Sequence, residues 1–184
     1  MMNLRKAGTD HRKFMRMIVV YTDITAPLYW WKEFSTYKVG TVANSCSTMH
    51  TIHKKEFTLD DFSHEHLDWT DAPEECYEAG DILDLIVKQL NVARSRYNIA
   101  NDRLRSKELS ISERKHILAQ RKRYWYSMIQ LLPSSYNQKR TVMLNYEVLA
   151  NIYTSRRDHK LDEWGAFCDW IRELPYSELI VGRN

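Results

Sequence analysis

The sequence has few cysteines and no pattern that would join them. Cys46, Cys76 and Cys168 are odd in number, lie far apart and form no Cys-x-x-Cys pair. A disulfide framework needs paired cysteines, and a zinc ribbon needs them closely spaced. We therefore expect neither, and this cysteine usage favours a reducing, cytoplasmic compartment.

Long apolar runs are also absent. No segment approaches the roughly 20 apolar residues that a membrane-spanning helix needs, and no secretory apolar region follows the basic residues near the N-terminus. The sequence therefore predicts a soluble protein with no membrane contact.

The common catalytic motifs are missing as well. No Gly-x-Ser-x-Gly, His-Glu-x-x-His, P-loop or Gly-x-Gly-x-x-Gly occurs. Four histidines (His50, His53, His64 and His66) gather in a short acidic region, but their spacing matches no common zinc pattern, so a solvated loop is favoured over a metal site. Cys46 would act as a nucleophile only if Lys38 or His50 lowered its pKa, and a buried inert cysteine is the favoured alternative.

What the chain does contain is typical of a globular protein. Its 184 residues are 43% hydrophobic and 28% charged, which predicts one ordered domain over 1–184 rather than disorder. The six tryptophans and eleven tyrosines are many for this length. Because large aromatic side chains dominate cores and interfaces, they also favour an oligomer.

Charge is unevenly distributed along the middle of the chain. Residues 57–87 carry ten acidic side chains and no Lys or Arg, whereas residues 94–123 carry ten basic and three acidic ones. Two solvated faces are the simplest interpretation. Complementary contact between neighbouring subunits is an alternative, and a basic patch for nucleic acid is the least favoured one.

The pattern of apolar residues predicts an α+β domain. Residues 14–24 are β-branched and aromatic, which is typical of a strand, and Pro27 is placed to begin a short helix with apolar residues at three-residue spacing. Ser110 and Glu113 match a capping box at the start of a long helix. The remaining expected elements are a loop over 58–84, a helix over 81–97, a strand over 137–144, and helices over 145–156 and 161–174. Strands near the start and in the late middle of the chain, with helices between and after them, favour an α+β domain over regular βαβ units.

The most informative segment is residues 26–50, APLYWWKEFSTYKVGTVANSCSTMH. Its aromatic half runs into a polar turn that offers an ammonium group, amides and hydroxyls suited to a phosphate or to the edge of a heterocycle. A turn whose side chains satisfy their own backbone fits the same residues. The polar residues concerned are Lys38, Thr41, Asn44, Ser45, Ser47 and Thr48.

A second polar set lies on the predicted helix after residue 145. Arg156 follows Asn145 by about three helical turns and so falls on nearly the same face, whereas Asn151 lies about a third of a turn away. On spacing alone, Asn145 acts as a helix cap and Arg156 as a counter-charge to the helix dipole.

Two stretches together resemble the flavin-dependent thymidylate synthase family, including its small phage or prophage members. In residues 26–50 an aromatic helix leads to Thr36-Tyr37-Lys38 in place of the family's Arg-His-Arg, and Ser47 follows after eight residues. Residues 131–171 are similar to the family's Leu-Pro, strand, Asn-x-Arg-Ser-Leu helix and closing amphipathic helix. The resemblance implies the family fold, an antiparallel sheet with packed helices, and a homotetramer with sites between subunits.

The resemblance also implies roles for individual residues. Asn44, Asn145 and Asn151 fall on positions that hold the flavin of FAD, and Ser47 on the serine beside the reacting uracil, which makes it the catalytic candidate. Lys38 and Arg156 are the candidates for binding the nucleotide substrate.

Several family arginines are replaced here. Met49 stands at the arginine that grips the dUMP phosphate, Ile129 at another nucleotide-binding arginine and Glu147 at a further one. Bidentate pairs of arginine with phosphate are among the stronger hydrogen bonds that a site can offer. We therefore expect a divergent relative that binds a nucleotide-like or flavin ligand in an inter-subunit cleft without classical dUMP methylation. An active flavin-dependent methyl or hydroxymethyl transferase acting on a pyrimidine nucleotide is the alternative, and a structural protein with a collapsed cleft is the third interpretation.

Overall fold

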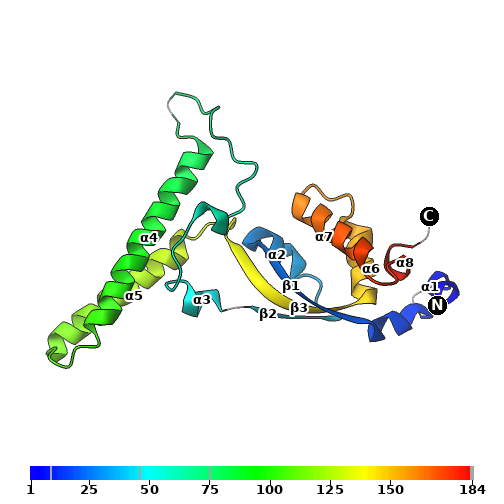
Figure 1. The fold of residues 1–184 in the computed structure, drawn as a ribbon, viewed down its shortest axis with the longest axis horizontal. Helices are drawn as coiled ribbons and strands as arrows, with labels where there is room; N and C mark the ends of the chain where they lie inside the picture. The colour runs from blue at the N-terminus through cyan, green and yellow to red at the C-terminus, as the bar shows by residue number, and fades with distance from the viewer. Residues whose placement is uncertain (9, 46, 75, 183–184) are drawn as a thin grey trace. The chain divides into compact units, whose positions relative to one another are not determined.

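The computed structural model describes residues 1–8, 10–45, 47–74 and 76–182. The chain divides into two compact units, one formed by Met1–Ser45 with Lys139–Asn184 and the other by Cys46–Gln138. Figure 1 traces both. The expected single domain over 1–184 stays a prediction.

A three-stranded sheet organises the first unit, with strand order β1-β3-β2. The β2 and β3 strands are antiparallel, with Thr41 opposite Leu144. The β1 strand also runs against β3, because the Tyr146 amide donates to the Ile18 carbonyl at 3.0 Å beyond one end of the pair and the Thr141 hydroxyl donates to Asp23 further along. The strands are β1 (Val19–Pro27), β2 (Thr41–Ser45) and β3 (Asn137–Asn145). The expected antiparallel α+β sheet is thus confirmed.

An aromatic core holds helices against this sheet. The indole rings of Trp30 and Trp164 lie 4.7 Å apart, and Phe34 and Phe167 join them. All four side chains are buried. The helices of this unit are α1 (Met2–Lys6), the 3-10 helix η1 (Arg12–Met17), α2 (Leu28–Phe34), α6 (Tyr146–Arg156), α7 (Asp162–Glu173) and α8 (Glu178–Val181).

A long helical hairpin dominates the second unit. The α4 and α5 helices pack along each other, and Leu90 and Met128 are fully buried in the core that they share with Phe62 (Figure 1). The predicted capping box is confirmed, because the Glu113 amide donates to Ser110 Oγ at 3.2 Å and the Ser110 amide donates to the Glu113 carboxylate at 2.9 Å. The elements are α3 (Thr48–Thr51), η2 (Leu59–Asp61), α4 (Ala79–Arg103) and α5 (Ile111–Leu131).

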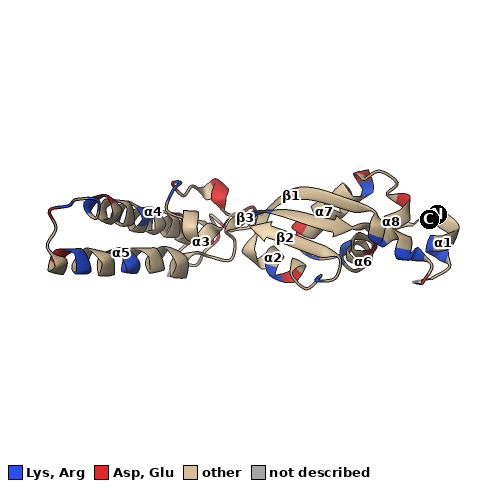
Figure 2. Ribbon diagram, turned by 90° about the horizontal axis from the view of Figure 1, so that it is seen from below, with Lys and Arg blue, Asp and Glu red and all other residues tan. Residues whose placement is uncertain are grey.

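Lys and Arg residues occur on both helices of this hairpin, as the blue segments of the ribbon in Figure 2 show. Several have local partners: Lys88 pairs with Asp84 at 2.5 Å, and the guanidinium groups of Arg96 and Arg123 lie over the Tyr124 ring. Such contacts fit the interpretation of solvated, locally compensated faces. Among the described residues, no helix is long and apolar enough to cross a bilayer.

Three elements differ from the sequence-based expectation. The helix expected over 81–97 runs from Ala79 to Arg103, so the loop before it is shorter than the expected 58–84. The strand expected over 14–24 begins only at Val19, because residues 12–17 turn as a 3-10 helix that buries Met15 completely. The segment after Gly40 was expected to be a turn, yet Thr41–Ser45 forms the edge strand β2. Its residues are mostly exposed, so the alternation of apolar and polar residues that marks a half-buried strand is absent.

Candidate functional site

Five residues predicted to bind a ligand belong to the first unit: Lys38, Asn44, Asn145, Asn151 and Arg156. The loop between α2 and β2 carries Lys38 and contacts both Asn145 and Arg156.

That loop begins with polar side chains that close the end of α2. The Ser35 hydroxyl donates to the Lys32 carbonyl and the Thr36 hydroxyl to the Glu33 carbonyl, each at 2.8 Å. These bonds satisfy carbonyl groups that a helix end leaves without a partner. Thr36, which stands at a family arginine, therefore has a structural role here.

The other end of the loop meets the start of α6. Asn145 caps this helix, because its Oδ1 accepts from the Val148 amide at 2.9 Å. The backbone N–H of Asn145 donates to the Gly40 carbonyl at 3.2 Å. A Cβ atom on Gly40 would lie only 2.4 Å from Asn145 Nδ2, and Gly40 has a φ of +79°. Glycine therefore suits this position for two independent reasons, its backbone conformation and the space beside it.

Arg156, at the far end of α6, is held by two groups from α2 and the loop. Its Nη1 donates to Glu33 Oε2 at 2.7 Å, and its Nε donates to the Tyr37 hydroxyl at 2.9 Å. The guanidinium also lies over the Trp164 ring, 4.8 Å from its centroid. A guanidinium stacks well on an aromatic face. The two hydrogen bonds and this ring contact together hold the Arg156 side chain in place.

The Glu33 carboxylate is the centre of this cluster. Besides Arg156, it accepts from Trp164 Nε1 at 3.0 Å and lies 3.5 Å from His159 Nε2. The side chains of Arg156 and Glu33 are 19% and 35% exposed, so water reaches the ion pair only in part. Sequence reasoning missed Glu33, because its partner Arg156 lies 123 residues away along the chain.

The loop is thus anchored at both ends of α6, a helix of eleven residues and about 16 Å in length. Lys38 lies between the two anchors and is exposed. Asn151 is exposed on α6, and Asn44 is exposed on β2 opposite Thr141. The structure therefore separates the five residues into two groups: Asn145 and Arg156 have internal partners, whereas Lys38, Asn44 and Asn151 are exposed.

Ser47, the catalytic candidate, belongs to the second unit. It is exposed and has a φ of +32°. Its carbonyl accepts from the His50 amide at 3.0 Å, so Ser47 begins the short α3 helix. Cys46, the alternative nucleophile, lies outside the described residues.

The three residues that stand at family arginines each contact other residues of this chain. Glu147 forms a two-pronged ion pair with Arg16, with N–O distances of 2.5 and 3.2 Å. Ile129 packs against the core of the second unit, and Met49 is exposed while its carbonyl accepts from Trp125 Nε1 at 2.9 Å. Unlike arginine, none of these three side chains attracts a phosphate.

The histidine-rich segment does not assemble a metal site. Among the residues that the structure describes, no group of three His, Cys, Asp or Glu side chains is placed to hold an ion. The His53 ring instead packs at a tilt against the Tyr97 ring, with centroids 4.7 Å apart, and burial lowers the pKa of His53 below its ordinary value. The Nδ1 atom of His64 lies 2.9 Å from the Phe62 carbonyl.

Comparison of the structure with known proteins finds matches, whereas comparison of the whole sequence finds none. No protein-family model matches the sequence, and no curated protein matches it. Two crystal structures of the flavin-dependent thymidylate synthase ThyX from Helicobacter pylori, each with FAD and dUMP, match with TM-scores of 0.50 and 0.51. Both are 14% identical, and each match covers 95% of this chain and 83% of that chain. The UMP/dUMP methylase PolB from Streptomyces cacaoi, bound with 5-Br UMP, matches with a TM-score of 0.40 and 13% identity over 90% of this chain and 76% of that one.

At such low identity the two ThyX matches establish the fold and nothing finer. The fold expected from residues 26–50 and 131–171 is thereby confirmed: this chain resembles flavin-dependent thymidylate synthase in structure.

Proposed function

We propose that this chain is a divergent relative of the flavin-dependent thymidylate synthases that binds a nucleotide-like or flavin ligand. The observation that carries the proposal is the anchoring of the loop from Ser35 to Gly40 at both ends of α6. This anchoring gathers residues that are distant in sequence on one compact unit. The similar ThyX structures hold FAD and dUMP, which names the ligand class to test first.

The exposed residues are the proposed ligand contacts. The Lys38 ammonium suits a phosphate, and the amides of Asn44 and Asn151 suit the edge of a heterocycle, because an amide both donates and accepts hydrogen bonds. Asn145 and Arg156 are proposed to position the site. Asn145 caps the start of α6, and Arg156 holds the loop through Tyr37 at the C-terminal end of α6. Ser47 is assigned a place beside the reacting base, in a cleft completed by other subunits of a homotetramer.

Classical methylation of dUMP is not part of the proposal. The resemblance places Met49 at the arginine that holds the dUMP phosphate, and Ile129 and Glu147 at two other family arginines. Glu147 is paired with Arg16. Arg156 already has a carboxylate partner in Glu33. The main cation available to a ligand phosphate would therefore be Lys38. One ammonium group binds a phosphate more weakly than two guanidinium groups do.

The same residues decide how well FAD fits. The side-chain amides of Asn44 and Asn151 match the hydrogen-bonding edge of a flavin ring. Among the predicted contacts only Lys38 and Arg156 are cationic, and Arg156 is paired with Glu33, so the pyrophosphate of FAD would be met by Lys38. When bound, a flavin supplies redox chemistry. The contribution of the protein is to orient the ligand through the asparagine amides and the Lys38 ammonium group. No catalytic step is assigned.

Native mass spectrometry of freshly purified protein tests assembly and bound ligand together. We expect a tetramer, and we expect FAD, FMN or dUMP to raise the unfolding temperature, since a ligand that binds only the folded state must stabilise it. Lys38→Ala combined with Asn44→Ala and Asn151→Ala should remove that rise, whereas Lys160→Ala, a change at another exposed lysine, should leave it intact.

Each other outcome has a defined meaning. A yellow tetramer that methylates a pyrimidine nucleotide would support the enzyme alternative and overturn the loss of activity. No shift with any flavin or nucleotide would overturn ligand binding and leave an interaction protein. A shift that survives the triple substitution would show that the contacts are wrongly assigned.

A further inference from the structure

The long α4 helix presents an exposed row of apolar side chains, Leu85, Val92 and Ile99, which we call the α4 row. Its members follow one another at seven-residue intervals, close to two helical turns, so they lie on one face of the helix. Their exposed fractions are 57%, 42% and 57%. A single exposed apolar residue is ordinary on a protein surface, but a row that extends over about 21 Å of helix is typical of an interaction site.

Two other sides of α4 are covered within the chain. Leu83, Leu90 and Ala93 are buried in the core that α4 shares with α5 (Figure 1). Asn91 binds the backbone of Phe57: its Nδ2 donates to the Phe57 carbonyl at 2.8 Å, and its Oδ1 accepts from the Phe57 amide at 2.9 Å. The α4 row belongs to neither side and is exposed to water.

A charged residue stands beyond each end of the α4 row, and the two charges have opposite signs. Asp81 lies about one turn before Leu85, and Arg103 lies about one turn after Ile99, so both continue the same face. Both side chains are exposed, and neither forms an ion pair within the described part of the chain. Each is therefore available to a partner of opposite charge.

The row and its end charges are arranged symmetrically about Val92. Leu85 and Ile99 are each seven residues from it. Asp81 and Arg103 are each eleven residues from it. When two copies of such a helix run antiparallel, each residue before Val92 meets the equally distant residue after it, so Asp81 meets Arg103 at both ends of the contact. A parallel copy would instead bring like charges together, so charge selects the antiparallel arrangement.

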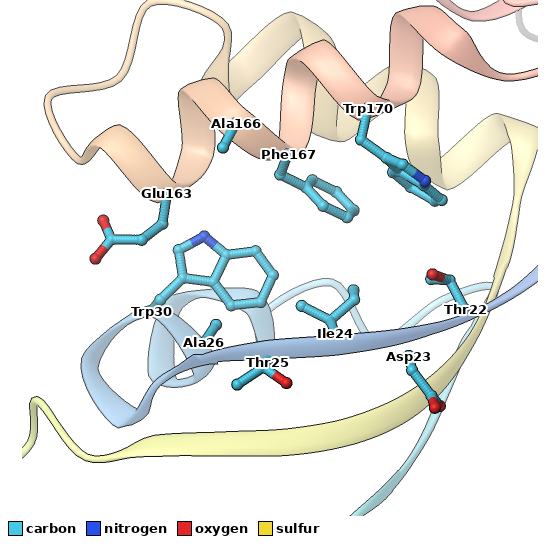
Figure 3. Close-up of a pocket in the computed structure, with 10 residues that line it drawn as sticks. All are labelled: Thr22, Asp23, Ile24, Thr25, Ala26, Trp30, Glu163, Ala166, Phe167 and Trp170. Atoms are coloured by element: carbon cyan, nitrogen blue, oxygen red, sulfur yellow. The ribbon is translucent and has the colours of Figure 1, made fainter. Parts of the chain in front are cut away.

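Another apolar surface of the molecule has no such unpaired charges. It is the cavity of about 370 Å³ between β1 and α7 of the first unit, whose lining residues are shown in Figure 3. Both of its carboxylates have partners within the chain, because Asp23 pairs with Lys139 at 2.7 Å and Glu163 accepts from the Tyr29 hydroxyl. Charge therefore specifies a partner for the α4 row and none for this cavity.

We propose that α4 packs antiparallel against α4 of a second copy of this chain, with a two-fold axis at Val92. The contact is one interface of the homotetramer proposed above and to that extent rests on the proposed function. Association removes the α4 row of both copies from water, which favours the paired state. The acidic start of α4 in one copy then lies beside the basic end of α4 in the other, so the uneven charge of the sequence is matched between subunits.

A cycle of charge reversals, measured on the full chain by sedimentation equilibrium, tests the pairing. Asp81→Arg places two arginines at each end of the contact, and Arg103→Asp places two aspartates there. Each single change should weaken association about tenfold or more. The double variant restores opposite charges in reversed order and should regain most of the affinity. Such recovery indicates direct pairing, because the effects of two independent changes would add.

Substitution of Val92 tests the position of the axis. Val92→Glu places two carboxylates side by side in an apolar contact and should weaken association about a hundredfold or more. Leu118→Glu is the matched control, because Leu118 is 41% exposed on α5. Leu118 follows the buried Ile117, whereas Val92 precedes the buried Ala93, so the two residues lie on opposite faces of an antiparallel hairpin. The control should associate like the wild-type chain.

A disulfide gives a direct measure of the same contact. In a chain that carries Cys46→Ser and Cys76→Ser, Val92→Cys should link two copies under mild oxidation, because a residue on a two-fold axis lies close to its own copy. Leu118→Cys in the same background should stay unlinked. If Val92→Glu fails to fold, as judged by circular dichroism, the cross-link and the charge reversals decide.

Three results would overturn the proposal: a wild-type chain that stays monomeric, a double charge reversal that associates no better than the single ones, or a folded Val92→Glu that associates like the wild type. Failure of the proposed function looks different. Absence of any stabilisation by FAD or dUMP would leave the charge-reversal cycle as expected, whereas a failed cycle with ligand stabilisation intact would remove this interface alone.

Discussion

Glu33 and Arg156 form an ion pair, with Oε2 of the first 2.7 Å from Nη1 of the second. The arginine predicted to hold a nucleotide is therefore bound to a carboxylate of its own chain. A ligand phosphate would have to compete with Glu33 for this guanidinium. Because the same carboxylate also accepts from the Trp164 indole, the pair connects α2 to both α6 and α7.

Replacing Glu33 tests what this carboxylate contributes. Glu33→Ala leaves the fully buried Trp164 N–H without its acceptor, and such a loss costs about 1–3 kcal/mol. Glu33→Gln keeps an oxygen acceptor and loses only the charge of a partly exposed pair, which should cost less than about 1 kcal/mol. Urea unfolding of both variants measures the difference. Equal losses in the two variants would show that the acceptor for Trp164 contributes nothing.

The same variant has a consequence for binding. Glu33→Gln leaves Arg156 without a charged partner, so dUMP should stabilise this variant more than it stabilises the wild-type chain. Uncharged deoxyuridine is the control and should show no such gain. A dUMP effect that stays the same would place the phosphate away from Arg156.

Asn145 and Asn151, two asparagines of one helical segment, should respond differently to alanine. Asn145→Ala removes the cap of α6 and should destabilise the chain by about 1 kcal/mol, whereas Asn145→Ser, which can still cap, should cost less. Asn151 is exposed, so Asn151→Ala should change stability by less than about 0.5 kcal/mol. Chemical denaturation gives these values, and a ligand titration of the Asn151 variant reports its proposed contact.

Gly40 and Gly165 provide a second contrast. Gly40→Ala combines a left-handed backbone with a Cβ that would collide with the Asn145 side chain, so it should destabilise the chain by more than about 1 kcal/mol. Gly165 lies inside α7 with open space beside it, so Gly165→Ala should stabilise the chain by up to about 1 kcal/mol. Thermal unfolding of the two variants should shift in opposite directions. A tolerated Gly40→Ala would mean that the loop moves away from α6 without loss.

The sequence predicted the local features of this chain well. Pro27 before α2, the Ser110 capping box and the Asn145 cap depend on neighbouring residues, and each is present. What it could not predict depends on distant partners. Strand β2 has no apolar alternation and exists because it pairs with β3. The ion pair of Arg156 with Glu33 joins residues 123 positions apart, so no local pattern indicates it.

Asp23 should make stability depend on acidity. Its pKa is held below the ordinary aspartate value by a hydrogen bond from Lys139 and then by one from the Thr141 hydroxyl. Because the folded chain favours the charged form, this contribution is present at neutral pH and is lost as the pH falls through the folded pKa. Asp23→Asn removes the titrating group. The stability advantage of the wild-type chain over this variant should therefore be largest at neutral pH and shrink in acid.

Added salt distinguishes the two interactions that lower the pKa of Asp23, the ion pair with Lys139 and the hydrogen bond from Thr141. Both partners of the Asp23–Lys139 pair are about half exposed, so high salt should screen its electrostatic part. The hydrogen bond from Thr141 lacks a net charge on the donor and should persist, so Thr141→Val should reduce the pH dependence that remains in high salt. Unfolding free energies measured across the acid range, with and without salt, provide the test. Parallel pH curves for the wild type and Asp23→Asn would contradict the lowered pKa, since a group with the same pKa in both states adds no pH dependence to folding.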